Sequence, residues 1–411
     1  MEPVAGVGRD SGSGRQVRTA GPPGRSGQRA WTARQANAVG QWVSSVLTRC
    51  PQGLTRRRRA LAWLYDAAVQ PSSPALTEGT LHSLLRQYDG LGRPRSCTPV
   101  SHGLLNRGYR LTTTRGCYFL KHHLDGPASL GRIERQHSAT ARLGALGLPV
   151  VPVVPAAEGR TVAVAEGRCF ALHPWIEGTH RHGSELTAGQ SRGLGALLGR
   201  VHVRLDRALP EAQRTSHESA DPAATYDMIG ALLERIRTRR HRDSFDELAE
   251  HRLTERRELL RRYAGERPGA APARFTGWVH GDFHPLNLLY APAGRSPRPV
   301  AILDWDRLGV HPRAEEAVRG AAIFFLRPGG TLDLRKVRAF ARAYRGGAGA
   351  SREELAAAVH RVWWERLNDF WMLRWRYQLS DVRADPQFPA AAALVVWWSS
   401  NYEAVRAAFC D

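Results

Sequence analysis

The stretch that decides the fold is WVHGDFHPLNLLYAPAGRSPRPVAILDWDRLG, residues 278–309. It begins as an apolar strand-like run, continues into a compact polar loop, and then gives two more strand-like runs separated by a Gly/Pro-rich turn. Asp282 and Asn287 are five positions apart on the loop, and Asp304 follows the second strand of the expected hairpin. The antiparallel return of this hairpin would bring Asp304 back beside Asn287.

These three side chains suit phosphoryl transfer. One carboxylate, that of Asp282, is free to take a proton from a hydroxyl group. The amide oxygen of Asn287 and the carboxylate of Asp304 are ligands for a hard cation, and Mg²⁺ takes oxygen ligands while keeping sites for substrate phosphates. Positioning and charge stabilisation of this kind are what transfer from ATP requires.

The regions outside this stretch predict two lobes. Before it, short strand-like runs surround one amphipathic helix, which indicates a small antiparallel sheet with a helix packed on it. After residue 178 the chain is predicted to be mainly helical. In the N-terminal part, Thr77 is a plausible N-cap of the helix expected at 77–88. The expected strands are 99–114 (with a turn), 116–123, 150–154, 161–165 and 168–176; the expected helices are 77–88, 130–146, 186–205, a pair within 223–264, and several from 315 to the end.

The motifs HGDFHPLN (280–287) and ILDWD (302–306) resemble those of the aminoglycoside phosphotransferase and choline kinase-like family, part of the protein-kinase-like superfamily. The type, order and spacing of the residues agree, and the resemblance extends over about 75–411. It implies an α+β, bilobal protein-kinase-like fold, with a small antiparallel β-rich N-lobe and a larger, mainly helical C-lobe. It also implies that Asp282 is the catalytic base and that Asn287 and Asp304 are Mg²⁺ ligands.

Lys121 gives independent support from the N-terminal part. Only two of the 59 basic residues are lysine, and this one ends the apolar strand CYFLK. A retained lysine among so many arginines indicates that a compact point charge is needed there, although an exposed strand end is the alternative. The resemblance implies that Lys121 binds the α- and β-phosphates of ATP. Glu134, the single acidic residue of the 130–146 helix, is the candidate partner of this lysine.

Other parts of the nucleotide site follow from the resemblance. The turn 101–109 (SHGLLNRGY) would cover the phosphates, with Gly103 and Asn106 as cofactor-binding residues, although two glycines in a hairpin are by themselves a weak signal. The segment 169–178 matches the family hinge, where backbone groups near His173 and Trp175 would bind adenine. We expect structural roles for His202, His280 and His284, and a capping or loop-anchoring role for Glu315. Asp306 could approach metal or substrate, since it points to the same side as Asp304 in an extended segment.

Three regions are expected along the chain: a disordered or weakly helical basic extension at 1–74, the N-lobe and hinge at 75–178, and the C-lobe at 179–411. The extension holds eleven arginines against Glu2, Asp10 and Asp66, a net +8 of the formal +21. The five cysteines are scattered without a C-x-x-C pair, which favours a reducing compartment. The N-terminus lacks an apolar signal stretch, and the run 390–398 is far short of a membrane span. We therefore expect a cytoplasmic protein.

The acceptor is the open question. Aminoglycosides, macrolides, choline and homoserine are all acceptors in the family, and the shared motifs do not separate a resistance enzyme from a metabolic kinase. Glu365 and Asp369 lie near Trp364, Trp371 and Trp375 and could bind a cationic acceptor. Tryptophans at helical spacing also suit a core, and neighbouring arginines argue against an acidic pocket. A basic nucleic-acid-binding protein and a catalytically dead kinase-like scaffold are the other classes considered. No nucleic-acid module is recognised, no membrane contact is expected, and the oligomeric state is undetermined.

Overall fold

The computed structural model describes residues 76–100, 106–210, 216–292 and 298–411. The N-terminal lobe is a five-stranded antiparallel sheet in the order β1-β2-β3-β5-β4. Register pairs Lys121 of β3 with Ala171 of β5, in the middle of the sheet. The strands are β1 (Pro94–Val100), β2 (Arg107–Thr113), β3 (Cys117–His123), β4 (Ala163–Ala165) and β5 (Arg168–Pro174).

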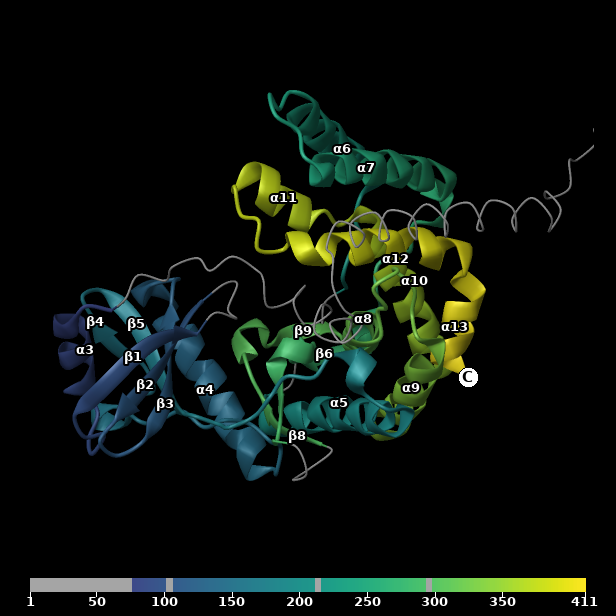
Figure 1. Cartoon of the computed structure of the whole chain (residues 1–411). Helices are drawn as coiled ribbons and strands as arrows, with labels where there is room; N and C mark the ends of the chain where they lie inside the picture. Colours follow the sequence, from purple (N-terminus) through teal and green to yellow (C-terminus); the bar gives the residue numbers. More distant parts are fainter. Residues whose placement is uncertain (1–75, 101–105, 211–215, 293–297) are drawn as a thin grey trace, which may run out of the picture. The chain divides into compact units, whose positions relative to one another are not determined.

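Two helices cover this sheet (Figure 1). Helix α3 (Glu78–Leu85) begins at Thr77, whose side chain accepts a hydrogen bond from the Thr80 amide, as the sequence predicted. Its leucines share an apolar core with one face of β2, β3 and β5. Helix α4 (Leu130–Ala145) buries Ile133 against Cys169, on the face of the sheet that also carries Lys121.

One predicted strand is absent. Residues 150–154 (VVPVV) form no regular strand; Val150 makes a single parallel bridge to Ile302, and Val154 donates to the Leu172 carbonyl. Prolines at 149, 152 and 155 remove three backbone donors from this segment, so it cannot form a continuous ladder. The remaining short runs at 161–165 and 168–176 do contain strands, β4 and β5.

The C-terminal lobe is mainly helical around one large apolar core. At its centre α5 (Ala188–Ala208) packs closely along α9 (Leu334–Ala348). A Cβ atom on Gly195 would lie 2.1 Å from the Phe340 carbonyl oxygen, so this close approach requires glycine. Further helices that contribute to this core are α8 (Arg313–Phe324), α10 (Arg352–Asn368), α12 (Phe388–Ser400) and α13 (Tyr402–Cys410).

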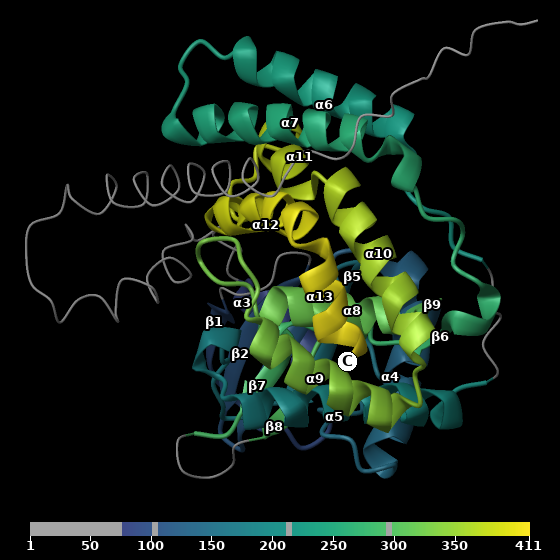
Figure 2. The same cartoon turned by 90° about the vertical axis from the view of Figure 1, so that its right-hand side faces the viewer.

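A second apolar cluster joins α6 (Pro222–Arg237) and α7 (Ser244–Arg262) to α11 (Trp371–Gln378) and α12. Both views show α6 and α7 side by side as a helical pair (Figures 1 and 2). This pair was expected within 223–264. No helix in the described ranges is long and apolar enough to cross a lipid bilayer.

Two short hairpin-like pairs carry the segment 276–312. Strand β6 (Thr276–Val279) pairs with β9 (Gly309–Pro312), and β7 (Leu288–Tyr290) pairs with β8 (Pro299–Ile302), both antiparallel. The antiparallel N-terminal sheet and the helical C-terminal lobe confirm the predicted α+β, bilobal arrangement. The predicted extension 1–74 lies outside the described residues, and its boundary stays a prediction.

Candidate active site

The loop of residues 280–287, here called the HGD loop, joins β6 to β7. Gly281 has φ of 86°, and a Cβ atom there would lie 2.2 Å from the Arg307 carbonyl oxygen, so only glycine fits this turn. Leu288 pairs with Ile302, and the Leu303 amide donates to the Asn287 carbonyl at 2.9 Å. The hairpin thus brings Asp304 next to Asn287, the arrangement expected from the spacing.

Asp282 lies at the open side of the HGD loop, with 30% of its side chain exposed. Its Oδ2 atom is 3.6 Å from His284 Nε2 and 3.8 Å from Arg307 Nε. Burial disfavours the charged form, but the hydrogen bond to His284 and the charge of Arg307 outweigh it and hold the pKa of Asp282 below its ordinary value. Asp282 is therefore an ionised carboxylate at neutral pH.

Buried side chains hold the HGD loop in place. Glu316 of α8 accepts hydrogen bonds from the amides of Gly281 (2.5 Å) and His280 (3.2 Å). The same carboxylate bonds His202 Nε2 at 2.7 Å, and His202 is fully buried. His280 accepts from the Asp282 amide and donates to the Leu303 carbonyl. The sequence predicted a capping or loop-anchoring role for Glu315; its neighbour Glu316 makes the contacts with the HGD loop, and Glu315 binds Arg361.

Asp304 has a left-handed backbone conformation, with φ of 55°. Its Oδ1 atom accepts from Lys121 Nζ at 2.7 Å. Burial disfavours the charged form, but the ammonium of Lys121 holds the pKa of Asp304 below its ordinary value. The two aspartates, Asp304 and Asp306, in turn keep the pKa of Lys121 raised despite its burial. The ion pair is therefore fully charged at neutral pH.

Asp306 connects the ILDWD segment to three N-terminal elements. Its Oδ1 accepts from Lys121 Nζ at 2.7 Å, and its Oδ2 accepts from Asn106 Nδ2 at 2.5 Å. Its carbonyl oxygen accepts from Gln136 Nε2 of α4 at 2.8 Å. Asp304 and Asp306 therefore face the same lysine, as expected, although residues 305–307 form a 3-10 turn and not the extended segment on which that expectation rested. These contacts make Asp306 a link between the lobes.

The partner predicted for Lys121 differs from the one observed. Within the described residues, Lys121 pairs with Asp304 and Asp306 and makes no ion pair with Glu134. The face of α4 that reaches the ILDWD segment instead presents Gln136. Gly103 belongs to residues 101–105, outside the described part of the chain, and its predicted phosphate contact stays a prediction.

The hinge also departs in part from expectation. The Trp175 amide donates to the Cys117 carbonyl at 3.0 Å, so this donor is already used by the sheet. Trp175 Nε1 donates to Glu177, and Arg110 stacks over the indole ring. His173 is paired with Phe119 in the sheet, and its Nδ1 lies 3.1 Å from the Pro152 carbonyl. Backbone recognition of adenine near His173 stays a prediction.

Three histidines lie behind Lys121. His137 of α4 contacts His123 of β3 and His173 of β5 edge to face, with ring centroids 6.3 Å and 5.8 Å apart. Burial and the nearby charge of Lys121 lower the pKa of His123 to about 3 and that of His173 to about 4. Burial, His173 and Lys121 lower the pKa of His137 to about 3. These imidazoles are neutral, and the sequence analysis did not single out His123 or His137.

Helices α8 and α10 form a wall beyond the HGD loop. Arg319 binds Glu365 through two hydrogen bonds of 3.1 and 2.6 Å, and Arg361 binds Glu315 at 2.5 Å. The carboxylate proposed for a cationic acceptor, Glu365, therefore has an arginine partner. Trp364 is fully buried and bonds the Ala220 carbonyl, in agreement with a core role.

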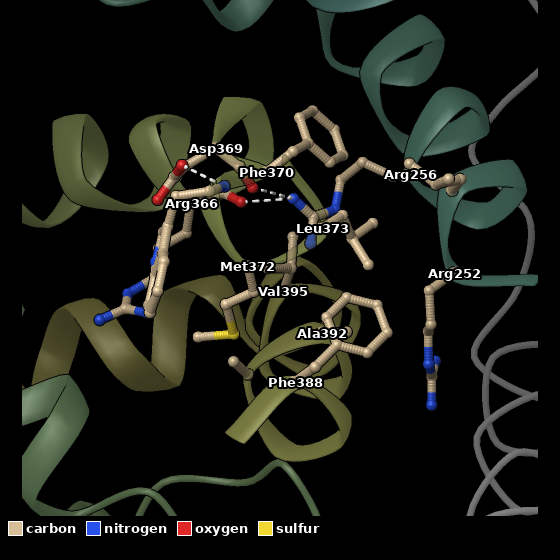
Figure 3. Close-up of a pocket in the computed structure, with 13 residues that line it drawn as sticks. Arg252, Arg256, Arg366, Asp369, Phe370, Met372, Leu373, Phe388, Ala392 and Val395 are labelled. Carbon is tan, nitrogen blue, oxygen red and sulfur yellow. Dashed lines mark hydrogen bonds between the residues drawn. The ribbon is translucent and has the colours of Figure 1, made fainter. Parts of the chain in front are cut away.

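A hollow lies beside this wall, between α7, α11 and α12 (Figure 3). Its empty volume, including the part open to solvent, is about 510 Å³. Arg256 crosses it and donates to the carbonyls of Arg366 and Leu367 at the end of α10. Asp369 and the apolar side chains of Phe370, Met372, Leu373, Phe388 and Val395 complete the lining.

Sequence reasoning missed Arg307, Gln136 and Glu316. Arg307 directly follows the ILDWD motif, so its position next to a recognised motif was a signal that could have identified it. Gln136 and Glu316 gave no local signal, because their partners are 170 and 35 or 36 positions away in the chain. Among the described residues, no group of three or more His, Cys, Asp or Glu side chains could hold a metal ion.

Comparisons with known proteins identify the family of this chain and structures with a similar fold. The APH model, described as the Phosphotransferase enzyme family, matches residues 96–350. A comparison with curated proteins finds no match. Among solved structures, spectinomycin phosphotransferase APH(9)-Ia, in complex with ADP and spectinomycin, has a TM-score of 0.56 at 14% identity, over 81% of this chain and 100% of that one.

Two further structures are similar. Amicoumacin kinase hAmiN, in complex with AMP-PNP, Ca²⁺ and Ami, has a TM-score of 0.53 at 16% identity, over 84% of this chain and 96% of that one. A microcompartment-associated aminopropanol kinase has a TM-score of 0.52 at 17% identity, over 81% of this chain and 99% of that one. At these identities the likeness concerns the fold. Because the family model covers more than half of its residues, this chain belongs to the Phosphotransferase enzyme family and is a small-molecule kinase.

Proposed function

We propose that this chain transfers the γ-phosphoryl group of ATP to a hydroxyl group of a small molecule, with Mg²⁺ as cofactor. The observation that carries the proposal is the placement of Asp282, Asn287, Asp304 and Lys121 around one hairpin. The similar structures solved with ADP or AMP-PNP support the use of ATP. The small molecules in the names of these relatives support an acceptor of this class.

Asp282 is the proposed catalytic base. Its ionised carboxylate lies at the open side of the loop, where it can accept the proton of the acceptor hydroxyl. The hydroxyl oxygen forms the new bond to the γ-phosphorus, the bond from that phosphorus to the bridging oxygen breaks, and ADP leaves with the electron pair. His284, whose Nδ1 accepts from the Leu286 amide, presents Nε2 to Asp282 and orients it.

The residues present fit Mg²⁺. The side-chain amide of Asn287 donates Nδ2 to the Asp282 carbonyl at 2.8 Å, which leaves its oxygen for a cation. Asp304 is an ionised carboxylate with 44% of its side chain exposed, and Lys121 occupies only one of its oxygens in the contacts described. When bound, Mg²⁺ would neutralise phosphate charge. Lys121, Asn106, Gly103 and the backbone near His173 and Trp175 are the proposed nucleotide-binding groups, with Glu134 retained from the family resemblance.

The acceptor is proposed to be an aminoglycoside or another hydroxylated antibiotic, with a homoserine- or choline-kinase-like metabolic role as the alternative. The spectinomycin and amicoumacin enzymes support the first, and the aminopropanol kinase supports the second. No nucleic acid is proposed as a partner.

The direct test replaces the proposed base. We expect Asp282→Asn to lower kcat for ADP release about 10²–10⁴-fold, because proton removal from the hydroxyl is lost while Asn keeps the shape of the side chain. Asp227→Asn, at an exposed position of α6, is the matched control. AMP-PNP binding, measured by calorimetry, should persist in both variants. Wild-type turnover by Asp282→Asn would refute the assignment.

A further inference from the structure

The wall formed by α8 and α10 offers few unpaired carboxylates. Glu315 and Arg319 are one turn apart on α8, and Arg361 and Glu365 are one turn apart on α10. They pair crosswise, Arg361 with Glu315 and Arg319 with Glu365. Burial opposes the charge of Glu365, but Arg319 holds its pKa below the ordinary value. Burial raises the pKa of Glu315, but Glu315 and Glu365 each already have a guanidinium partner.

This wall lies close to the HGD loop. Helix α8 touches the loop on both sides of Arg319: Glu316 holds the amides of His280 and Gly281, and Gly320 faces the Phe283 carbonyl oxygen. That oxygen is 3.0 Å from where a Cβ atom of Gly320 would lie. The Arg319–Glu365 pair remains partly open to solvent, with 35% and 42% of the side chains exposed. An acceptor that reaches Asp282 along α8 would meet a paired, nearly neutral wall.

The hollow beside α8 and α10 also offers few carboxylates to a cationic ligand. Its charged lining residues are Arg252, Arg256, Arg366 and Asp369 (Figure 3). Asp369 accepts from the Trp371 amide, and burial raises its pKa above the ordinary value. The Nε atom of Arg366 is buried and has no hydrogen-bond partner among the described residues. Arginine therefore exceeds carboxylate here, which is unfavourable for a ligand with several ammonium groups.

Arg307 places a further positive charge at Asp282 itself. Its Nε atom is 3.8 Å from Asp282 Oδ2, and 57% of its side chain is exposed. Among the described residues, the guanidinium makes no hydrogen bond, so its donors are available to a ligand. A guanidinium presents a planar fork of donors that matches a carboxylate or a phosphate. A bound anion and a hydroxyl on Asp282 would then be only a few bonds apart in one small molecule.

We propose that the acceptor carries an anionic group near its reacting hydroxyl, that Arg307 binds this group, and that polycations are poor acceptors. This inference rests on the phosphotransferase function proposed above and favours a homoserine-like metabolic acceptor over choline or an aminoglycoside. Arg307 is then a residue that determines specificity. The paired side chains of α8 and α10 and the arginine-rich hollow disfavour polyamines, and the exposed guanidinium of Arg307 favours the anion.

The test compares acceptors that differ in charge. ADP release is measured with full-length protein, ATP and Mg²⁺, using L-homoserine and other short hydroxy acids, the matched pair 4-hydroxybutyrate and 4-hydroxybutyramide, choline, and kanamycin. We expect kcat/KM for the carboxylate to exceed that for the amide about 10–100-fold, the value of one charge-assisted hydrogen bond. Choline and kanamycin should be poorer still.

Variants of Arg307 identify the residue responsible. Arg307→Gln should remove the preference for the carboxylate by raising its KM, whereas Arg307→Lys should keep part of it. Arg338→Gln, at an exposed position of α9, should leave the preference unchanged. An equal fall of kcat for both members of the pair would assign Arg307 to the transferring phosphoryl group and overturn the inference.

Two other outcomes separate the proposals. A higher kcat/KM for kanamycin or choline, or a panel in which no hydroxy acid is phosphorylated while a cation is, would overturn the inference and leave the phosphotransferase function intact. If no acceptor in the panel gives ADP release, the anionic acceptor class is overturned as well. If the wild-type protein also fails to bind AMP-PNP in the presence of Mg²⁺, the proposed phosphotransferase function itself is contradicted.

Discussion

Asp306 makes three contacts that join the N-terminal sheet to the catalytic hairpin, with Lys121, Asn106 and Gln136. Removing its carboxylate takes a shared acceptor from the lysine and the asparagine that we propose to bind nucleotide. We expect Asp306→Ala to raise KM for ATP about 10–100-fold, with a smaller effect on kcat, because one charge-assisted contact contributes about 1.5–3 kcal/mol. Steady-state kinetics and AMP-PNP calorimetry measure this split.

Asp227→Ala is the control, since Asp227 is exposed on α6. A double-mutant cycle with Asn106→Ala should give a coupling energy, because the two side chains share a hydrogen bond. A large loss of kcat with unchanged KM for ATP would contradict the positioning role and point to direct chemistry at Asp306.

The contacts of Asp306 also show what the sequence could reveal about single residues. The arrangement of Asp282, Asn287 and Asp304 was predictable, because all three belong to one hairpin whose geometry follows from short spacings. The partners of Lys121 were not, since Asp304 lies 183 positions away and the contact depends on how the two lobes pack. Glu134 was predicted because it is the single acidic residue of its helix. That reasoning does not consider carboxylates from other parts of the chain, and Asp304 and Asp306 are the ones that pair with Lys121.

Helix α8 positions the HGD loop through Glu316, which is 3% exposed. Its carboxylate has three partners: the amides of His280 and Gly281, and the ring of His202. We expect Glu316→Ala to lower the free energy of unfolding by about 3–5 kcal/mol, because it leaves buried donors without an acceptor. Urea unfolding at pH 7 measures this loss, and Glu316→Gln should lose less.

Glu353→Ala is the control for the unfolding measurement on Glu316→Ala, because Glu353 is an exposed first-turn residue of α10. Burial disfavours the charged form of Glu316, but His202 and the backbone amides hold its pKa below 4.5. Its contribution to stability is therefore present above pH 4.5 and is lost as pH falls through the lowered value. A Glu316→Ala variant as stable as wild type at pH 7 would contradict the anchoring role.

Elements were more predictable than their contacts. The helix at 130–146, the Thr77 cap and the helical pair within 223–264 follow from local periodicity and capping, and the structure has all of them. The prediction of a strand at 150–154 was wrong, because it gave more weight to the apolar residues than to the prolines in and beside this segment. The crosswise pairing of α8 with α10 needed the tertiary structure, since each helix alone shows only alternating charges.

At the scale of the whole molecule, the formal charge of +21 says little about a polyanionic partner. Many arginines of the described C-terminal lobe are paired internally, as Arg237 and Arg242 are with Glu250. Arg307 is different, because its guanidinium lies 3.8 Å from the proposed base and makes no hydrogen bond within the described part of the chain. The meaning of a basic composition therefore depends on which guanidiniums have partners, and only the structure shows that.

The buried histidines behind Lys121 make a prediction about the stability of the whole chain in acid. The pKa values of His123 and His137 are about 3 when folded, against an ordinary 6.5. Between these values the unfolded chain binds protons that the folded chain does not, so stability falls as pH drops below 6.5. Each histidine should contribute a loss of about 1.4 kcal/mol per pH unit in that range.

Replacing one of these histidines should remove its share of this loss. We expect the free energy of unfolding of His137→Gln, relative to wild type, to rise by about 1 kcal/mol between pH 6.5 and pH 5.5, because the unfolded histidine is only half protonated at pH 6.5. Urea unfolding of both proteins at each pH gives this difference. Any effect of the substitution on the free energy of unfolding that does not depend on pH cancels between the two pH values. His241→Gln, at an exposed position, should show no such change. A difference between His137→Gln and wild type that does not vary with pH would mean that folding does not lower the pKa of His137.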